Sequence, residues 1–155
     1  MKYLISACLA GKKCNYKGGS NVVKKLREMY LKGDAILVCP EVMGGLKTPR
    51  EAAEILTFQE KLTVKTVSGK DVTEAFIIGA GKVLKVAKEN KITTAILKAR
   101  SPSCGCNQVY DGTFSKKIVN KDGITAALLK LNGIKVITEE EILYKLKKSS
   151  DDEEQ

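Results

Sequence analysis

Short runs of mainly apolar residues alternate with segments of helical periodicity along most of the chain. The apolar runs have the length and composition of strands that are buried on both faces of a parallel sheet. We expect four such strands, at residues 2–7, 35–39, 93–99 and 134–137. We expect helices over residues 22–31, 71–90, 123–131 and 138–148. This alternation predicts an α/β fold with an open, mostly parallel sheet and helices on both faces.

Local signals refine the helices and add one strand. Residues 61–67 alternate in polarity, which predicts an edge strand or a hairpin arm. Asp71 and Glu74 have the spacing of a capping box for the helix that follows, and Thr138 is expected to cap the last helix. Residues 79–81 read Gly-Ala-Gly inside the helix after Asp71. No predicted strand leads into that segment, so we interpret it as a packing notch rather than a nucleotide-binding loop.

The chain has 155 residues, which is enough for one hydrophobic core and too little for two. We expect a single Rossmann-like α/β domain over residues 1–148, followed by a disordered acidic tail over residues 149–155. Hydrophobic residues make up 43% of the chain, so wholesale disorder is excluded. No apolar run reaches the roughly 20 residues that span a bilayer, so we expect no membrane-spanning segment.

The charge is strongly basic, with 27 lysines and arginines against 18 acidic residues and a net charge of +9. Residues 151–154 are all acidic, so the rest of the chain is more basic than this total. The basic part of the chain before these residues should attract anions such as nucleotides or RNA. Only Arg27, Arg50 and Arg100 are arginines, however, and surface lysines equally serve solubility.

The chain contains no histidine and five cysteines. The missing histidine excludes Ser-His-Asp and Cys-His nucleophiles, zinc sites that contain histidine, and haem held by histidine. The segment Ile5-Ser6-Ala7-Cys8 resembles a lipoprotein cleavage site but lacks the apolar stretch of a signal peptide before it. We therefore expect a cytoplasmic protein whose cysteines stay reduced.

Three cysteines follow three predicted strands. Cys8 and Cys39 come at strand ends, and Cys104 lies just past the third strand. Because the carboxyl ends of parallel strands face one crevice, the three thiols should meet there. A group of thiolates without histidine suits a soft metal site such as an iron–sulfur cluster, Cu(I) or zinc. The cysteines are not spaced in the close pairs of zinc ribbons, however, nor in the cysteine motif of ferredoxins. Three protein ligands would leave one iron of a cluster open to substrate. Two alternatives stay open, namely buried apolar cysteines and a thiol redox pair.

Other candidate residues lie beside these cysteines. Glu41 stands two residues after Cys39, where a carboxylate can shuttle protons; a surface glutamate after a proline turn is the alternative. Gly44 and Gly45 allow the backbone to approach a ligand closely, or simply turn the chain. Arg100 is well placed for a phosphate.

Four longer motifs connect these residues. They are Cys8-Leu9-x-Gly11-x-x-Cys14-x-Tyr16-x-Gly18, Cys39-Pro40-Glu41-x-x-Gly44-Gly45-Leu46-x-Thr48-Pro49-Arg50, Leu97-Lys98-Ala99-Arg100-Ser101-Pro102-Ser103-Cys104-Gly105 and Tyr110-Asp111-Gly112-Thr113-Phe114. Together they resemble the DUF523 family, which includes the thiouracil desulfidases, in its short single-domain form. The resemblance runs from Cys8 to about Gly133. The family usually has Arg-Tyr-Asp-Gly where this chain has Asn15-Tyr16-Lys17-Gly18, and Cys106 is not part of its pattern.

The resemblance implies a [4Fe-4S] cluster whose fourth iron takes the sulfur of a thiocarbonyl substrate. The reaction would be a non-redox hydrolysis that turns 4-thiouracil compounds, notably 4-thiouridine monophosphate, into the uracil form plus sulfide. The implied cluster ligands are Cys8, Cys39 and Cys104. The implied catalytic residues are Glu41 as proton shuttle, Ser101, and Cys14 as an alternative ligand or a nearby thiol. The expected substrate-binding residues are Tyr16, Gly44, Gly45, Lys98, Arg100 and Ser103.

The expected partners follow from this function. A thiolated pyrimidine or nucleotide is the expected substrate and sulfide the product; a thiolated base within tRNA is a less favoured substrate, and no membrane partner is expected. The alternative function is a metal-containing basic RNA-binding module without catalysis. The chain has only five tyrosines and three phenylalanines, which offers little aromatic surface for stacking RNA bases.

Overall fold

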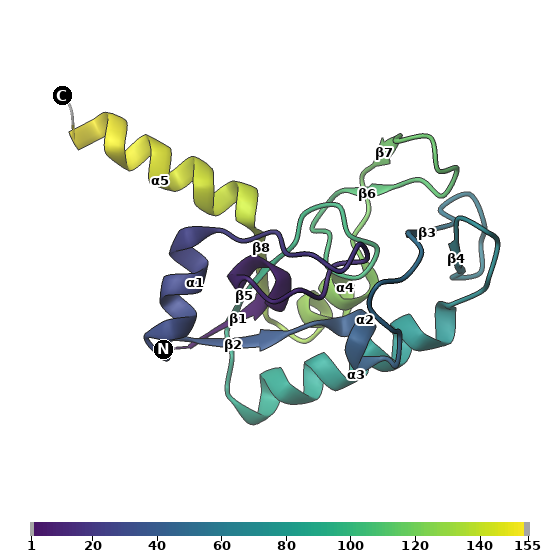
Figure 1. Cartoon of the computed structure of the whole chain (residues 1–155), viewed down its shortest axis with the longest axis horizontal. Coiled ribbons are helices and arrows are strands. Elements are labelled where there is room, and N and C mark those ends of the chain that lie inside the picture. The colour runs from purple at the N-terminus through teal and green to yellow at the C-terminus, as the bar shows by residue number, and fades with distance from the viewer. Residues whose placement is uncertain (1, 154–155) are drawn as a thin grey trace.

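The computed structural model describes residues 2–153, and its core is a four-stranded, wholly parallel sheet (Figure 1). The strands are β1 (Tyr3–Ser6), β2 (Ala35–Val38), β5 (Thr94–Leu97) and β8 (Lys135–Thr138), in the order β2-β1-β5-β8. These are the four strands expected from the sequence, each shifted by at most two residues. The predicted parallel α/β fold is confirmed.

Helices cover both faces of this sheet, as predicted. They are α1 (Lys24–Leu31), α3 (Thr73–Glu89), α4 (Ile124–Leu131) and α5 (Glu139–Glu153). On one face Leu4 of β1 packs in a cluster with Val83 of α3 and Leu129 of α4. Its neighbour Ile5 belongs to the cluster on the opposite face, with Leu26 of α1. Successive residues of β1 thus supply two cores, which is why the strand is apolar without alternation.

Two small antiparallel sheets lie beyond the carboxyl ends of the central strands (Figure 1). One pairs β3 (Ala53–Ile55) with β4 (Val64–Thr66), and the other pairs β6 (Val109–Tyr110) with β7 (Ile118–Val119). The first confirms the hairpin arm predicted at residues 61–67. Within the described residues, no helix is both long and apolar enough to cross a membrane.

The helix starts and ends differ from expectation in two places. The capping box at Asp71 and Glu74 is wrong, because α3 begins only at Thr73; the Asp71 carboxylate instead accepts hydrogen bonds from the Thr73 N–H and hydroxyl. Thr138 does cap the last helix, since its hydroxyl oxygen accepts the Glu141 N–H. That helix runs past residue 148 to Glu153. Residues 154–155 of the expected tail lie outside the described residues, and the division into domain and tail stays a prediction.

A short helix, α2 (Pro40–Met43), packs against α3 through two glycines. A Cβ at Gly79 would lie 1.9 Å from the Pro40 carbonyl oxygen, and one at Gly44 would lie 1.9 Å from the Ala75 carbonyl oxygen. The predicted packing notch is thus confirmed at Gly79. Because α2 directly follows β2, this contact fixes the segment that carries Cys39 and Glu41.

The notch can be tested with a matched pair of substitutions. We expect Gly79→Ala to lower the free energy of unfolding by about 1–3 kcal/mol, because the added methyl group would overlap the α2 backbone. Gly81 lies in the same helix with nothing within 4 Å of an added Cβ. Gly81→Ala should therefore stabilise the protein by about 0.5–1 kcal/mol. Urea denaturation of both variants is the measurement, and equal effects would contradict this account of the notch.

Candidate active site

A cavity of about 550 Å³ opens at the carboxyl edge of the parallel sheet, and four of the five cysteines line it. Cys8 stands in a 3₁₀ turn, η1 (Ala7–Ala10), directly after β1. Cys39 follows β2 and precedes α2, while Cys104 lies in the loop after β5. Cys14 joins them from the loop after η1. The convergence expected from strand topology is confirmed, although these residues are up to 96 positions apart in the sequence.

Burial and mutual repulsion work against ionisation of two of these thiols. Burial raises the pKa of Cys8 to about 11, and the nearby Cys39 adds to the increase. Burial likewise raises the pKa of Cys104, which is only 4% exposed; the Ser6 hydroxyl opposes this effect, while Cys8 and Cys39 increase it. Cys8, Cys39 and Cys104 thus lie within electrostatic reach of one another.

Cys39 is the thiol of the cavity that ionises first. Its pKa is lowered to about 6, mainly because the Cys14 thiol donates a hydrogen bond to its thiolate. Burial opposes this effect, while the Val42 N–H at the start of α2 and the Arg50 guanidinium add to it. The pKa of Cys14 is raised in turn, because its proton is held by Cys39.

An ion pair joins the cysteine loop to α2. Nε of Arg50 lies 3.2 Å from Oε1 of Glu41, and Nη2 donates to the Cys14 carbonyl oxygen at 2.9 Å. The Arg50 side chain is only 10% exposed, so the pair is largely shielded from water. Sequence reasoning assigned no role to Arg50. Only its place in the Thr-Pro-Arg motif signalled it, since its partners are nine and 36 residues away.

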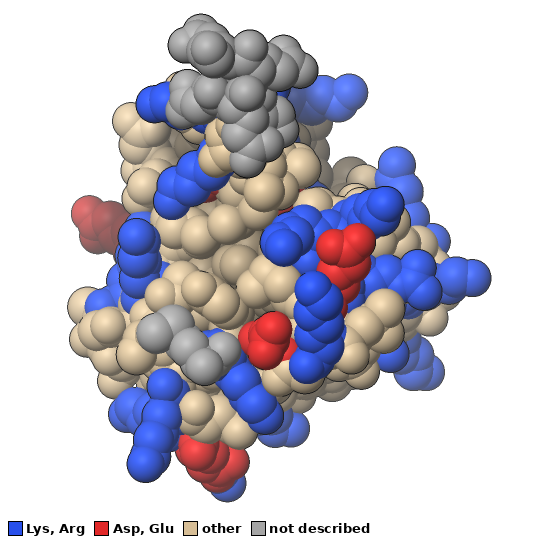
Figure 2. All heavy atoms as spheres, turned by 90° about the vertical axis from the view of Figure 1, so that its left-hand side faces the viewer, with Lys and Arg blue, Asp and Glu red and all other residues tan. Residues whose placement is uncertain are grey.

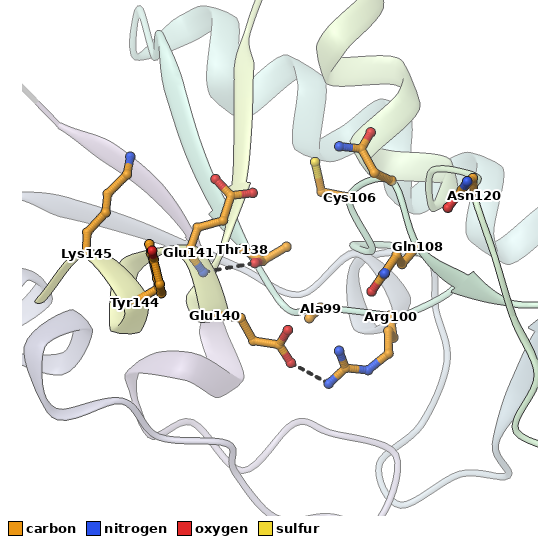
Figure 3. Close-up of a pocket in the computed structure, with 11 residues that line it drawn as sticks. Ala99, Arg100, Cys106, Gln108, Asn120, Thr138, Glu140, Glu141, Tyr144 and Lys145 are labelled. Carbon is orange, nitrogen blue, oxygen red and sulfur yellow. Dashed lines mark hydrogen bonds and ion pairs between the residues drawn. The ribbon is translucent and has the colours of Figure 1, made fainter. Parts of the chain in front are cut away.

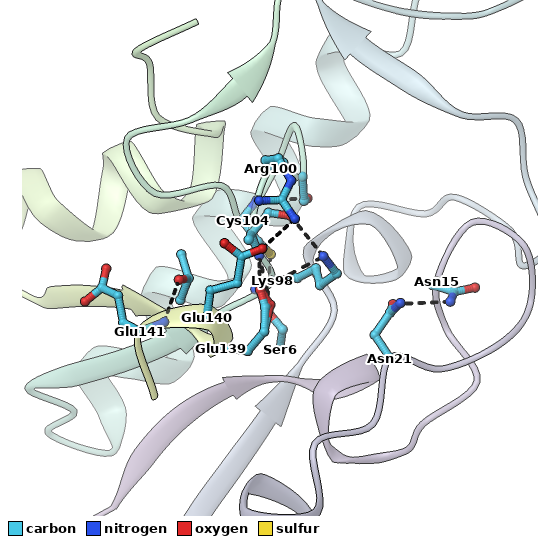
Figure 4. Close-up of polar contacts among 12 residues, drawn as sticks. Ser6, Asn15, Asn21, Lys98, Arg100, Cys104, Glu139, Glu140 and Glu141 are labelled. Carbon is cyan, nitrogen blue, oxygen red and sulfur yellow. Dashed lines mark hydrogen bonds and ion pairs between the residues drawn. The ribbon is translucent and has the colours of Figure 1, made fainter. Parts of the chain in front are cut away.

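The segment after β5 brings the remaining polar groups to the cavity (Figure 4). Nζ of Lys98 lies 4.0 Å from a buried Glu139 oxygen, and the Arg100 guanidinium pairs with Glu140 at 2.5 Å. The Ser101 hydroxyl oxygen accepts the N–H groups of Ser103 and Cys104 at 3.1 Å and 3.0 Å. Both contacts use its oxygen as acceptor, so the hydroxyl proton is left for a group in the cavity.

The cavity includes most but not all of the expected site residues. Tyr16, Glu41, Lys98, Arg100 and Ser101 line it together with the four thiols. Lys17, Lys116, Arg50 and Glu54 also line it, and the sequence analysis assigned none of them a role.

Three expected substrate-binding residues, Gly44, Gly45 and Ser103, are absent from the described lining, so their role in binding stays a prediction. The close contact with α3 accounts for a glycine at position 44. Gly45 turns the chain with a φ of 99°. Ser103 is 1% exposed, and its hydroxyl makes no hydrogen bond within the described part of the chain.

A second cavity, of about 570 Å³, lies beside the first and shares Ala99 and Arg100 with it (Figure 3). Amide side chains, Tyr144 and the fifth cysteine, Cys106, line it. The Cys106 thiol donates to the Val136 carbonyl oxygen at 3.3 Å. Cys106 is therefore separate from the four thiols of the first cavity.

The donor set of the first cavity favours a cluster over a single ion. Among the described residues, no three Cys, Asp or Glu side chains are grouped closely enough to hold one metal ion. In an iron–sulfur cluster each thiolate binds a different iron, so the ligands stand farther apart. Three of the thiols reach this cavity from segments that follow three different strands, which suits ligands that bind different irons.

The positive charge is not concentrated in one patch on the face shown in Figure 2. Lysine and arginine side chains are spread around this face, with few acidic side chains among them. On this face the basic side chains do not form a continuous stripe of the kind that follows a nucleic-acid strand.

Comparisons with known proteins agree with the fold and the thiol site. A family model described as 2-thiouracil desulfurase matches residues 3–141. The uncharacterized protein YbbK of Bacillus subtilis (strain 168) is 45% identical over 145 residues, which cover 90% of this chain and 96% of that protein. The solved structure of the [4Fe-4S]-dependent thiouracil desulfidase TudS is similar with a TM-score of 0.84 and 38% identity, over 96% of this chain and 97% of that one. The chain therefore belongs to the 2-thiouracil desulfurase family, DUF523.

Proposed function

We propose that this protein is a [4Fe-4S]-dependent desulfidase that removes sulfur from thiouracil compounds by hydrolysis, without net oxidation or reduction. One observation carries the proposal: a single cavity holds four cysteine thiols and the Glu41–Arg50 ion pair. Membership of the family and the likeness to TudS support the same reaction class.

The proposed cluster ligands are Cys8, Cys39 and Cys104. Each of the three lies just past the end of a different strand of the central sheet and lines the one cavity, which supports this set. Cys14 is the remaining thiol, and its proton is engaged with Cys39. When bound, the cluster supplies a soft iron with an open coordination position, which prefers sulfur to oxygen and polarises the C–S bond as a Lewis acid.

Two residues of the cavity handle water and protons. The Glu41 carboxylate, oriented by Arg50, accepts a proton from the water that attacks the ring carbon. The hydroxyl proton of Ser101 orients the substrate or the attacking water. The C=S bond is replaced by C=O, the oxygen comes from water, and the sulfur leaves as sulfide with the two protons. The reaction balances without an electron donor.

The charge of the cavity favours a substrate that bears a phosphate. Lys17, Lys98, Arg100 and Lys116 all line it, and the first of these stands in the segment where this chain departs from the family pattern. Because Glu140 pairs with Arg100 and Glu139 pairs with Lys98, Lys17 and Lys116 supply most of the attraction. The proposed substrate is therefore 4-thiouridine monophosphate rather than the free base.

The ligand set can be tested by cysteine substitution. We expect Cys8→Ala, Cys39→Ala and Cys104→Ala each to lose most of the iron and labile sulfide of the anaerobically reconstituted protein, because the variants keep only two of the proposed ligands. Cys106→Ala is the matched control and should keep a full complement, since its thiol lies in the second cavity. Cys14→Ala should also retain the cluster; loss of iron in that variant would assign Cys14 as a ligand instead.

The reaction itself can be tested without a reductant. We expect the iron-loaded protein to consume 4-thiouridine monophosphate under anaerobic conditions and to release one sulfide per thiocarbonyl lost. The absorbance of the thiocarbonyl measures the loss of substrate, and a sulfide assay measures the product. A strict requirement for a reductant would rule out the hydrolytic mechanism. A loaded protein that is inactive but binds RNA with strong salt dependence would instead favour the RNA-binding alternative.

The role of Glu41 can be tested separately from cluster binding. We expect Glu41→Gln to lower kcat by about 100-fold or more while iron content stays unchanged, because the amide can still accept the Arg50 hydrogen bond but cannot take a proton. Steady-state kinetics with matched iron analysis is the measurement. A kcat near that of the wild type would remove Glu41 from the mechanism.

A further inference from the structure

Ser6 is a buried polar residue at the end of an otherwise apolar strand. It is the last residue of β1, and the residue is only 3% exposed. A buried hydroxyl lowers stability unless it forms hydrogen bonds. The Ser6 hydroxyl has two partners, namely the Lys98 N–H at 3.0 Å and the Cys104 Sγ at 3.4 Å (Figure 4).

The chemistry of these partners fixes the direction of both hydrogen bonds. A backbone N–H is only a donor, so the Ser6 oxygen must be the acceptor of the Lys98 contact. A hydroxyl has a single proton, and that proton is then directed at the Cys104 sulfur. The same hydrogen bond opposes the effect of burial on the pKa of Cys104.

The central sheet, and not a loop, holds the Ser6 hydroxyl in this position. Ser6 pairs with Val38 in the parallel register between β1 and β2, and Lys98 directly follows β5 on the other side of β1. Cys104 is also nearly inaccessible to water and lines the cavity. The Ser6 hydroxyl therefore contacts Cys104 from a strand of the sheet, and Ser6 lines the same cavity as the four thiols.

We propose that Ser6 is a positioning residue for the cluster, which donates a hydrogen bond to the Cys104 thiolate and raises the reduction potential of the cluster. This inference rests on the proposed function, because it takes Cys104 as a ligand. A hydrogen bond to a ligand sulfur withdraws electron density from iron, and it also fixes the orientation of the ligand. An iron that is poorer in electrons is the stronger Lewis acid toward a thiocarbonyl sulfur.

The experiment compares the reconstituted wild type with Ser6→Ala. We expect Ser6→Ala to bind iron, to have a lower reduction potential in an EPR-monitored titration, and to lose iron faster to a chelator. Thr125→Val is the matched control: its hydroxyl is fully buried and makes no hydrogen bond within the described residues, so its loss should leave the potential unchanged. Ser6→Thr, which keeps a hydroxyl, should restore the wild-type potential.

A measurement on the wild type alone guards against misfolding of the variants. Proton ENDOR of the reduced cluster should detect an exchangeable proton coupled to it, which deuterium oxide removes. The proposal is overturned by the absence of that proton, by an unchanged potential in Ser6→Ala, or by an equal shift in Thr125→Val. A wild type that binds no cluster would overturn the proposed function as well, so the two failures can be told apart.

Discussion

The parallel pairing of β1 with β2 and β5 is the constraint on which the site depends. These three strands end at one edge of the sheet, and each leads directly into a segment that carries a cavity thiol. The register also sets Ser6 beside the start of the next segment at Lys98. Backbone hydrogen bonds of the sheet thus fix the distances between groups that are far apart in the sequence, and the loops contribute mainly the surface of the cavity.

Four thiols in one buried cavity oppose each other's ionisation. Only Cys39 has a lowered pKa, and its stabilisation depends on a proton that Cys14 retains. Burial holds the protons on Cys8 and Cys104. Loading a cationic cluster must therefore release protons from these residues, so affinity for the cluster increases with pH.

Much of this arrangement could be predicted from the sequence, because it follows from apolar runs and from where they end. The four central strands and the convergence of Cys8, Cys39 and Cys104 depend only on that pattern. The Glu41–Arg50 pair could not be predicted, since it joins a short helix to a loop and has no periodicity. The contact of Gly44 with α3 could not be predicted either, because a glycine that allows contact between helices looks the same in sequence as one that admits a ligand.

Arg100 connects the two cavities, because it forms part of the wall of each. It adopts a left-handed backbone conformation with a φ of 62°, which is strained for a residue with a side chain, and it lines both cavities. Its guanidinium is tied to Glu140 in the first turn of α5, the helix that points away from the rest of the fold in Figure 1. A force that displaces α5 would pull on this ion pair and so alter the wall of the thiol cavity. Through Arg100, the position of α5 is thus linked to the cavity that holds the four thiols.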